Sequence, residues 1–273
     1  MAIDFPARPA DRCAGARAPA GETQARDSLR GHDRTRPFLS LIVPAKDEAE
    51  NLPLLHERIC AALAPREDWE LVLVDDGSAD GTASVIRALA ERDSRVGGVF
   101  LARNFGQTAG LVAGLSEARG ELVVTLDADL QNDPADIPRL IAALDVHDAV
   151  VGYRIRRNDS FVRRASSRIA NAVRNRISGD SIRDTGCSLK VFRTRVLREL
   201  PWFEGMHRFL PTLVRYRGGS VIELPVAHHP RRAGQSKYGI RNRAWRAFLD
   251  LLAVRWMRRR MLRTQIREVL HAR

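Results

Sequence analysis

With 273 residues, of which 44% are hydrophobic, the chain can bury one large core or two small ones and has the composition of a globular, enzyme-sized protein. The formal net charge is +12, and basic residues concentrate after about residue 150, which indicates a partner that carries phosphate, such as nucleic acid or an anionic membrane. Three widely spaced cysteines argue against a disulfide framework and favour a reducing compartment. Without an apolar leader or ~18 consecutive apolar residues, we expect neither a signal peptide nor a transmembrane helix.

The chain is expected to begin with a disordered tail, because residues 1–37 are rich in Ala, Arg, Pro and Gly and lack apolar periodicity. An apolar run at residues 38–43 predicts the first strand, which Pro44 stops. A helix is predicted to open at Asn51, since apolar residues then recur at helical spacing as far as Leu63.

Three more apolar strands follow, separated by two helical segments. Asp80 is a suitable N-cap for a helix that runs through Ala90. A helix of small residues follows Gln107, and Gly120 is expected to supply its left-handed C-cap. The three strands are predicted at residues 70–74, 96–101 and 122–126, and another strand is predicted later, at 221–225.

Short apolar strands that alternate with helices predict an α/β fold with a mostly parallel, doubly wound sheet. In such sheets, ligands bind beyond the carboxyl ends of the strands. Acidic and amide residues gather at that edge in greater number than tight turns require. The set comprises Pro44, Asp47, Glu48, Asp75, Asp76, Asn104, Gln107, Asp127 and Asp129.

The fourth predicted strand leads into Asp127-Ala128-Asp129-Leu130-Gln131. Because residues two apart on a strand point the same way, Asp127, Asp129 and Gln131 are expected to converge on one point. Their oxygen atoms suit a hard divalent cation that also holds a phosphate. An Asp-x-Asp pair alone is more often a turn, so the interpretation depends on the whole set at this edge.

Six segments in order carry a recognisable pattern: residues 42–48, 74–82, 103–107, 127–131, 184–190 and 231–238. The first four resemble family 2 of the inverting glycosyltransferases, which have the GT-A nucleotide-sugar fold. The last two narrow the resemblance to the polyprenyl-phosphate glycosyltransferases, such as dolichol-phosphate mannose synthase and the bacterial undecaprenyl-phosphate sugar transferases. The bacterial aminoarabinose-type enzymes are especially similar, and the resemblance spans about residues 38–255.

The resemblance implies transfer of one sugar, with inversion, from a nucleoside diphosphate sugar (UDP favoured) to a polyprenyl phosphate such as undecaprenyl phosphate, in the synthesis of cell-envelope glycans or glycolipids. Asp129 and Gln131 would bind Mg²⁺ or Mn²⁺, which neutralises the leaving diphosphate, and Asp127 would lie at the donor ribose, sugar or metal. Gln107 would lie near the donor base. The base and ribose would be held by Pro44, Ala45, Asp47, Glu48 and Asp76.

The second half of the chain is implied to bind the acceptor. Asp184 matches an acidic position in the family's pattern near the sugar or acceptor and is our third catalytic candidate, although a helix cap or a partner for Arg183 would also explain it. A basic amphipathic helix is expected at 161–178 and suits a membrane surface, although an ordinary surface helix would look the same. The expected phosphate ligands are Arg163, Arg231, Arg232, Ser236 and Lys237.

Residues 241–273 combine many arginines with Trp, Phe and Leu, which predicts a basic amphipathic helical tail at the membrane interface. We expect the protein to be cytoplasmic and peripheral on the inner face of the cell membrane. The GT-A domain is expected at residues 38–240, with a nucleotide-binding half (38–133) and an acceptor-binding half (134–240). A homo-oligomer or a membrane-protein partner is left open.

Three alternative functions compete with this interpretation. A processive polysaccharide synthase would carry Gln-x-x-Arg-Trp, but Leu252 stands where the Gln before Arg255-Trp256 would be. A family 2 transferase with a polysaccharide or protein acceptor is left open. A non-catalytic membrane- or nucleic-acid-binding module is disfavoured, and no nucleic acid partner is expected, because the acidic edge would repel phosphates without a metal and no recognisable nucleic-acid-binding motif is present.

Overall fold

The computed structural model of the chain describes residues 37–154, 174–230 and 240–260, all within one unit that spans residues 34–273. The expected tail at 1–37 lies almost entirely outside these ranges, as do most of the helix expected at 161–178 and the whole of the loop at 231–238.

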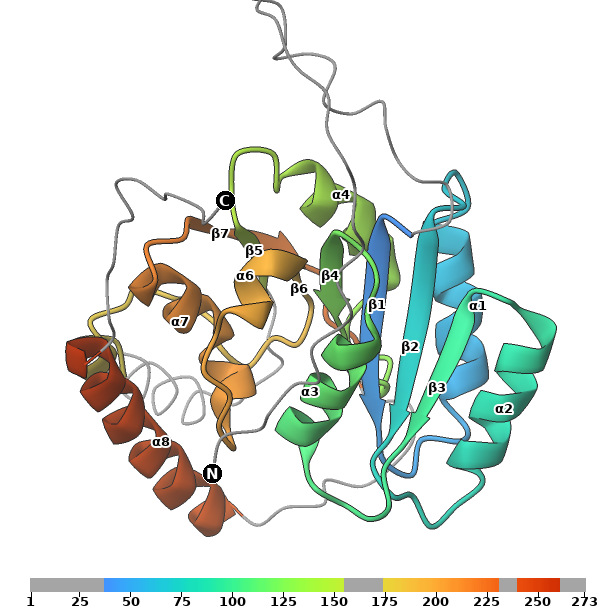
Figure 1. Ribbon diagram of the computed structural model, residues 1–273, viewed down its shortest axis with the longest axis horizontal. Helices are drawn as coiled ribbons and strands as arrows, with labels where there is room; N and C mark the ends of the chain where they lie inside the picture. The colour runs from blue at the N-terminus through green and yellow to red at the C-terminus, as the bar shows by residue number, and fades with distance from the viewer. Residues whose placement is uncertain (1–36, 155–173, 231–239, 261–273) are drawn as a thin grey trace, which may run out of the picture. The chain divides into compact units, whose positions relative to one another are not determined.

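A seven-stranded sheet forms the centre of the described chain, in the order β3-β2-β1-β4-β6-β5-β7 (Figure 1). Strands β1 to β4 are parallel, β5 and β7 are parallel to each other, and β6 runs antiparallel to its neighbours β4 and β5. The predicted GT-A-like α/β fold is confirmed, although β5 and β6 were not predicted. The strands are β1 (Leu39–Ala45), β2 (Trp69–Asp75), β3 (Val96–Phe100), β4 (Leu122–Thr125), β5 (Ala149–Arg154), β6 (Lys190–Arg193) and β7 (Val221–Val226).

Helices cover both faces of the sheet, and the alternation of side chains along the strands supplies each face with its own core. On one face, Leu41 and Leu71 pack with residues of α1, α2 and α4; on the other, Ile42 and Val72 pack with residues of α3, α6, α7 and α8. The helices are α1 (Leu52–Ala62), α2 (Thr82–Arg92), α3 (Gln107–Glu117), η1 (Pro134–Asp136), α4 (Ile137–Ala142), α6 (Thr194–Arg198), η2 (Met206–Arg208), α7 (Leu210–Tyr216) and α8 (Ile240–Arg260).

Two glycines allow backbones to approach each other closely. Gly77 has a φ of +63°, and a Cβ there would lie 2.4 Å from the carbonyl carbon of Arg103, so a side chain would push the β2–α2 and β3–α3 loops apart. Gly120 does not have the left-handed conformation that we expected of a C-cap. A Cβ at Gly120 would instead lie 2.7 Å from the backbone nitrogen of Ser40, so this glycine lets the chain enter β4 beside β1.

Two other local expectations are corrected. Helix α2 begins at Thr82 with Gly81 as its N-cap, although the Asp80 carboxylate still accepts a hydrogen bond from the Thr82 amide at 2.9 Å. Strand β4 ends at Thr125, so residues 127–131 are not extended, and Leu130 has a φ of +62°. Strand alternation therefore does not apply to the Asp-x-Asp segment, which is a turn.

Candidate functional site

Three loops at the carboxyl edge of β1, β2 and β3 are tied together by hydrogen bonds. Asp76, after β2, is buried, and its two carboxylate oxygens accept from the backbone amides of Phe105 (2.7 Å) and Gly106 (2.9 Å). Lys46, after β1, donates to the carbonyl oxygen of Gly77 at 2.7 Å. Asp76 thus positions the loop that leads into α3 and Gln107.

The other residues expected to hold the nucleotide lie in three different surroundings: the cavity, the hydrophobic core and the loops of the edge. Pro44 lines a cavity, which is described below, whereas Ala45 is buried in the hydrophobic core. The Asp47 carboxylate accepts from the Ala79 amide at 2.7 Å, and the Glu48 carboxylate accepts from Asn51 at 2.6 Å. In this structure, these two acids therefore also organise the loops of the edge.

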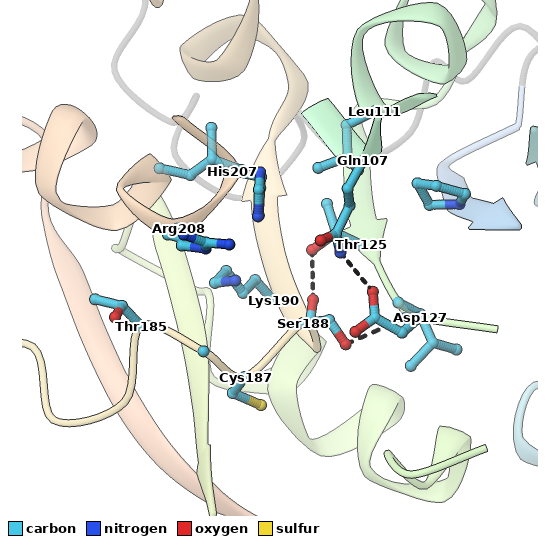
Figure 2. A pocket seen from close by; sticks show the side chains of 14 residues that line it. Gln107, Leu111, Thr125, Asp127, Thr185, Cys187, Ser188, Lys190, His207 and Arg208 are labelled. Carbon is cyan, nitrogen blue, oxygen red and sulfur yellow. Dashed lines mark hydrogen bonds between the residues drawn. The ribbon is translucent and has the colours of Figure 1, made fainter. Parts of the chain in front are cut away.

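A cavity of ≈ 510 Å³ opens beside the end of β4 (Figure 2). Gln107 and Asp127 lie on one side, and Lys190, His207 and Arg208 face them from the other. The cavity thus brings residues of α3 and the β4 end together with residues of β6 and η2. Its lining comprises Pro44, Gln107, Leu111, Thr125, Leu126, Asp127, Thr185, Gly186, Cys187, Ser188, Lys190, His207, Arg208 and Leu210.

Asp127 is held at the cavity by its neighbours. Its Oδ1 accepts from Gln107 Nε2 at 2.8 Å, and its backbone amide donates to Ser188 Oγ at 3.2 Å. Two expected site residues, Asp127 and Gln107, are therefore in direct contact. Asp129 is buried, its Oδ1 accepts from the Gln131 amide at 3.2 Å, and neither Asp129 nor Gln131 lines the cavity.

Lys190 and Asp184 approach the site from the segment around β6. Lys190 is buried, and burial lowers the pKa of its ammonium group, although Cys187, Asp127 and Asp184 oppose that shift. Asp184 accepts three hydrogen bonds from Arg154, from Nε at 2.6 Å, from Nη2 at 2.8 Å and from the backbone amide at 3.3 Å. The basic partner of Asp184 is thus Arg154, whereas Arg183 lies over the Tyr153 ring.

His207 is the imidazole of the cavity. Its Nδ1 lies 2.8 Å from Thr108 Oγ1, which also accepts from the Gly205 amide at 3.1 Å. Burial and the nearby cations Arg208 and Lys190 lower the pKa of His207 to about 3, so the ring is neutral at physiological pH. The neutral ring shares one hydrogen bond with the Thr108 hydroxyl through Nδ1, and the tautomer decides which of the two groups donates.

We expect His207 to make the fold sensitive to acid. In the unfolded chain this histidine is protonated below about pH 6.5, whereas in the folded protein it stays neutral down to about pH 3. The free energy of unfolding therefore falls as the pH is lowered between these two values, by at most about 1.4 kcal/mol per pH unit. Urea unfolding at pH 7 and pH 5 should show a smaller loss for His207→Gln than for the wild type. Equal losses in the two proteins would contradict the assignment.

Several expected acceptor residues, namely Arg163, Arg231, Arg232, Ser236 and Lys237, lie outside the described residues. Arg174 lies in the described end of the basic helix, but its Nη1 donates to Thr185 Oγ1 at 2.7 Å, so its guanidinium points into the protein instead of toward a membrane. Within the described residues, His229 is held near the Asp-x-Asp turn, because its amide donates to the Gln131 carbonyl at 2.8 Å.

Sequence reasoning did not assign a role to Lys190, His207 or Arg208. Lys190 is the last residue of the 184–190 segment that carries the family resemblance. A lysine at the start of a strand is nevertheless typical of a surface position, so the pattern does not indicate a role in the site. His207 and Arg208 follow no periodic pattern, and only the packing of η2 beside α3 brings them to Gln107.

Comparison with known proteins agrees with this geometry. The family described as "Glycosyl transferase family 2" matches residues 40–201. The dodecaprenyl-phosphate galacturonate synthase of Rhizobium johnstonii is 43% identical over 81% of the chain and 67% of its own length. The undecaprenyl-phosphate 4-deoxy-4-formamido-L-arabinose transferase of Edwardsiella ictaluri is 41% identical over 76% of the chain and 65% of its own length. The chain thus spans about two thirds of the length of these relatives.

A solved structure shares the fold at low sequence identity. Glucosyl-3-phosphoglycerate synthase from Mycobacterium tuberculosis, in complex with Mn²⁺, UDP-glucose and phosphoglyceric acid, superposes with a TM-score of 0.57 at 18% identity, over 81% of this chain and 80% of that one. In the part of the chain that the structure describes, no helix has the length and apolar character needed to cross a membrane.

Proposed function

Since the chain belongs to glycosyltransferase family 2, we propose that it transfers a single sugar from a nucleoside diphosphate sugar, UDP favoured, to a polyprenyl phosphate such as undecaprenyl phosphate. The product would serve cell-envelope glycan or glycolipid synthesis. Two relatives whose names specify polyprenyl-phosphate sugar transfer, and which match 81% and 76% of the chain, support this acceptor. The division of residues 38–240 into a nucleotide-binding half and an acceptor-binding half belongs to the same proposal.

The geometry that carries the proposal is the cavity at the carboxyl edge. An acid on one side, Asp127, faces the basic groups Lys190 and Arg208 on the other. A glycosyl donor has both a sugar, whose hydroxyls are bound by carboxylates and amides, and a diphosphate, which is bound by cations. The volume of ≈ 510 Å³ lies within the range of sites for small molecules.

In the proposed reaction, a phosphate oxygen of the lipid attacks C1 of the sugar. The bond from C1 to the diphosphate breaks, and its electron pair leaves with the diphosphate, so the configuration at C1 is inverted. Because the attacking oxygen is already anionic at neutral pH, no strong general base is needed. The protein would contribute by orienting the donor through Asp127 and Gln107 and by stabilising negative charge through Lys190 and Arg208.

The residues at the β4 end fit a divalent cation. Asp127 and Asp129 offer hard oxygen ligands from one turn, and Mg²⁺ typically binds through one or two carboxylates together with substrate phosphates. We propose Asp129 and Gln131 as ligands of Mg²⁺ or Mn²⁺, with Asp127 beside them. When bound, the cation would supply Lewis-acid neutralisation of the leaving diphosphate.

A direct assay tests the function. The purified chain should be incubated with undecaprenyl phosphate and a panel of radiolabelled nucleotide sugars, with Mg²⁺ or Mn²⁺ present or removed by EDTA. We expect an organic-extractable product from one sugar, formed only with the cation. Transfer to a water-soluble glycan or to protein, with no lipid product, would replace the polyprenyl acceptor with one of the alternatives.

We further propose that α8 attaches the protein to an anionic membrane. Leu249, Leu252 and Trp256 are exposed on one face of α8, spaced for a single stripe, with the exposed Arg255 and Arg259 beside them. The opposite face packs into the core through Leu251 and Val254. This separation leaves an apolar stripe beside basic residues for a lipid surface, which supports the proposal for the described part of the expected tail, residues 241–260.

The purified protein is expected to sediment with anionic liposomes at low salt. Each basic residue near such a surface contributes about 1 kcal/mol, so the double change Arg255→Gln and Arg259→Gln should weaken binding by roughly 30-fold. Val146→Ala removes a side chain that is 79% exposed in a different part of the chain and serves as the control. Wild-type protein that stays in the supernatant would contradict the attachment.

A further inference from the structure

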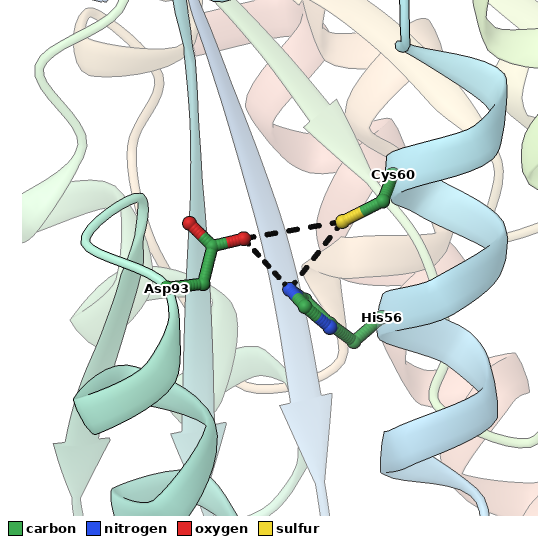
Figure 3. A group of neighbouring side chains, drawn as sticks. All are labelled: His56, Cys60 and Asp93. Atoms are coloured by element: carbon green, nitrogen blue, oxygen red, sulfur yellow. Dashed lines mark hydrogen bonds and ion pairs between the residues drawn. The ribbon is translucent and has the colours of Figure 1, made fainter.

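A cluster of three metal-ligating side chains lies between α1 and the end of α2 (Figure 3). His56 and Cys60 project from α1, one helical turn apart, toward Asp93, which follows α2. Asp93 precedes β3, so the cluster is at the amino end of that strand, whereas the cavity is at the carboxyl end of β4. The wide spacing of the three cysteines gives no indication of a metal site, but His-x-x-x-Cys on one helix face was the available signal.

The donor atoms are arranged like three corners of a tetrahedron. His56 Nε2 lies 3.0 Å from Asp93 Oδ2 and 3.4 Å from Cys60 Sγ, and Cys60 Sγ lies 3.9 Å from Asp93 Oδ2. Zinc binds such atoms at about 2.0–2.3 Å, which separates neighbouring ligands by about 3.3–3.7 Å. Shifts of a few tenths of an ångström would therefore bring all three atoms into the coordination sphere of one ion.

A nucleophilic thiol site is a poorer explanation of the same residues. In a Cys-His-Asp relay the imidazole uses one ring nitrogen for the thiol and the other for the acid. Here His56 Nε2 faces both partners. Burial also raises the pKa of the Cys60 thiol, which is the opposite of what an activated nucleophile needs.

The guanidinium of Arg95 already contacts the Asp93 carboxylate, but the two hydrogen bonds from Arg95 to Asp93 Oδ1 are compatible with a metal at this site. Its Nε and backbone amide both donate to Asp93 Oδ1, at 2.9 and 3.0 Å, while Nη2 contacts Oδ2 at 2.8 Å. A metal would displace Nη2 from Asp93 Oδ2 and also from Cys60 Sγ, which it contacts at 3.8 Å. The two bonds to Oδ1 would still orient the carboxylate, as partners of metal ligands commonly do. One Zn²⁺ with a thiolate and a carboxylate is neutral overall, so Arg95 would not face a net positive charge.

From this geometry we propose that His56, Cys60 and Asp93 form a zinc site, with water as the fourth ligand, separate from the Mg²⁺ or Mn²⁺ site proposed for sugar transfer. The cluster joins α1 to the end of α2, so a bound ion would fasten these two helices together at the amino edge of the sheet. The site is separate from the cavity, because none of the residues that line the cavity belongs to it.

Cobalt tests the proposal, since a thiolate bound to Co²⁺ gives a charge-transfer absorption in the near ultraviolet. The full chain, stripped with a chelator, should develop this band with one equivalent of Co²⁺ and lose it when Zn²⁺ is added. Cys187→Ser is the matched control because Cys187 is also a free thiol, and it should keep the band. Cys60→Ser and His56→Gln should lose it and bind Zn²⁺ more than about 100-fold more weakly.

The zinc site would be overturned by the absence of a cobalt band in the wild type, or by a band that survives in both Cys60→Ser and His56→Gln. Circular dichroism of the metal-free variants reports whether each one is folded, and two ligand variants are used so that misfolding of one leaves the test intact. Asp129→Asn should keep the band at full strength, because Asp129 does not belong to the cluster. Loss of the band in both Asp129→Asn and Cys187→Ser would assign the cobalt to the β4 turn, where Cys187 Sγ lies 3.5 Å from Asn132 Oδ1, and would also overturn the proposal.

Discussion

Replacing Asp129 by Asn is expected to lower sugar transfer by about 10³-fold while the protein keeps its fold. The change removes the negative charge of a proposed metal ligand, and the Lewis-acid contribution of a bound cation is worth several kcal/mol, or several factors of ten in rate. The fold should survive because Asp129 Oδ1 accepts a hydrogen bond from the Gln131 amide, and an asparagine oxygen accepts it equally well. The measurement is the initial rate of lipid-linked sugar formation at saturating Mn²⁺.

The metal dependence of the variant distinguishes a ligand from a merely structural acid. If Asp129 binds the cation, the Mn²⁺ concentration for half-maximal rate should rise in Asp129→Asn by about tenfold or more. Asp145→Asn is the matched control, because it removes one exposed carboxylate from a loop outside the cavity and should change neither quantity. Near-normal turnover in Asp129→Asn would remove this residue from the metal site.

The first half of the fold could be predicted from the sequence because three of its four strands, β1, β2 and β4, are buried on both faces, whereas β3 is largely exposed. The buried strands are mostly apolar, and helices α1 and α2 show apolar residues at helical spacing, so local patterns and the final packing agree. Strands β5 and β6 escaped prediction. β6 has four residues and begins with a buried lysine, and its antiparallel pairing with β4 depends on contacts between distant parts of the chain.

The part of the candidate site that could be predicted consists of residues that directly follow the strands of the sheet. Asp127 and Gln107 each follow a strand in the expected topology, and they do meet at 2.8 Å. The sequence could not indicate that the Asp76 carboxylate accepts hydrogen bonds from two backbone amides, since this depends on how the loop at residues 105–106 folds over the carboxylate. Nor could it place His207 in the cavity, because that requires the packing of η2 against α3.

Lys190→Met is expected to lower sugar transfer by about 10²-fold while stability stays equal or rises. A lysine that is only 4% exposed loses most of its hydration, and methionine fills a similar volume without that cost. The activity should fall because the ammonium group lines the cavity opposite Asp127, where it can stabilise negative charge, and the loss of one such preorganised donor typically costs 10²–10³-fold in rate.

The effects of Lys190→Met on activity and on stability distinguish a functional lysine from a structural one. A lysine retained for stability would give a variant that unfolds at lower urea concentration, with activity that falls only as far as the folded fraction does. A lysine retained for chemistry costs stability in the free protein, so its removal should leave the urea midpoint unchanged or higher while kcat/KM falls. Arg195→Met, at a side chain that is 73% exposed beside β6, is the control and should preserve activity. If Lys190→Met is markedly less stable and fully active per folded molecule, then Lys190 supports the strand and not the reaction.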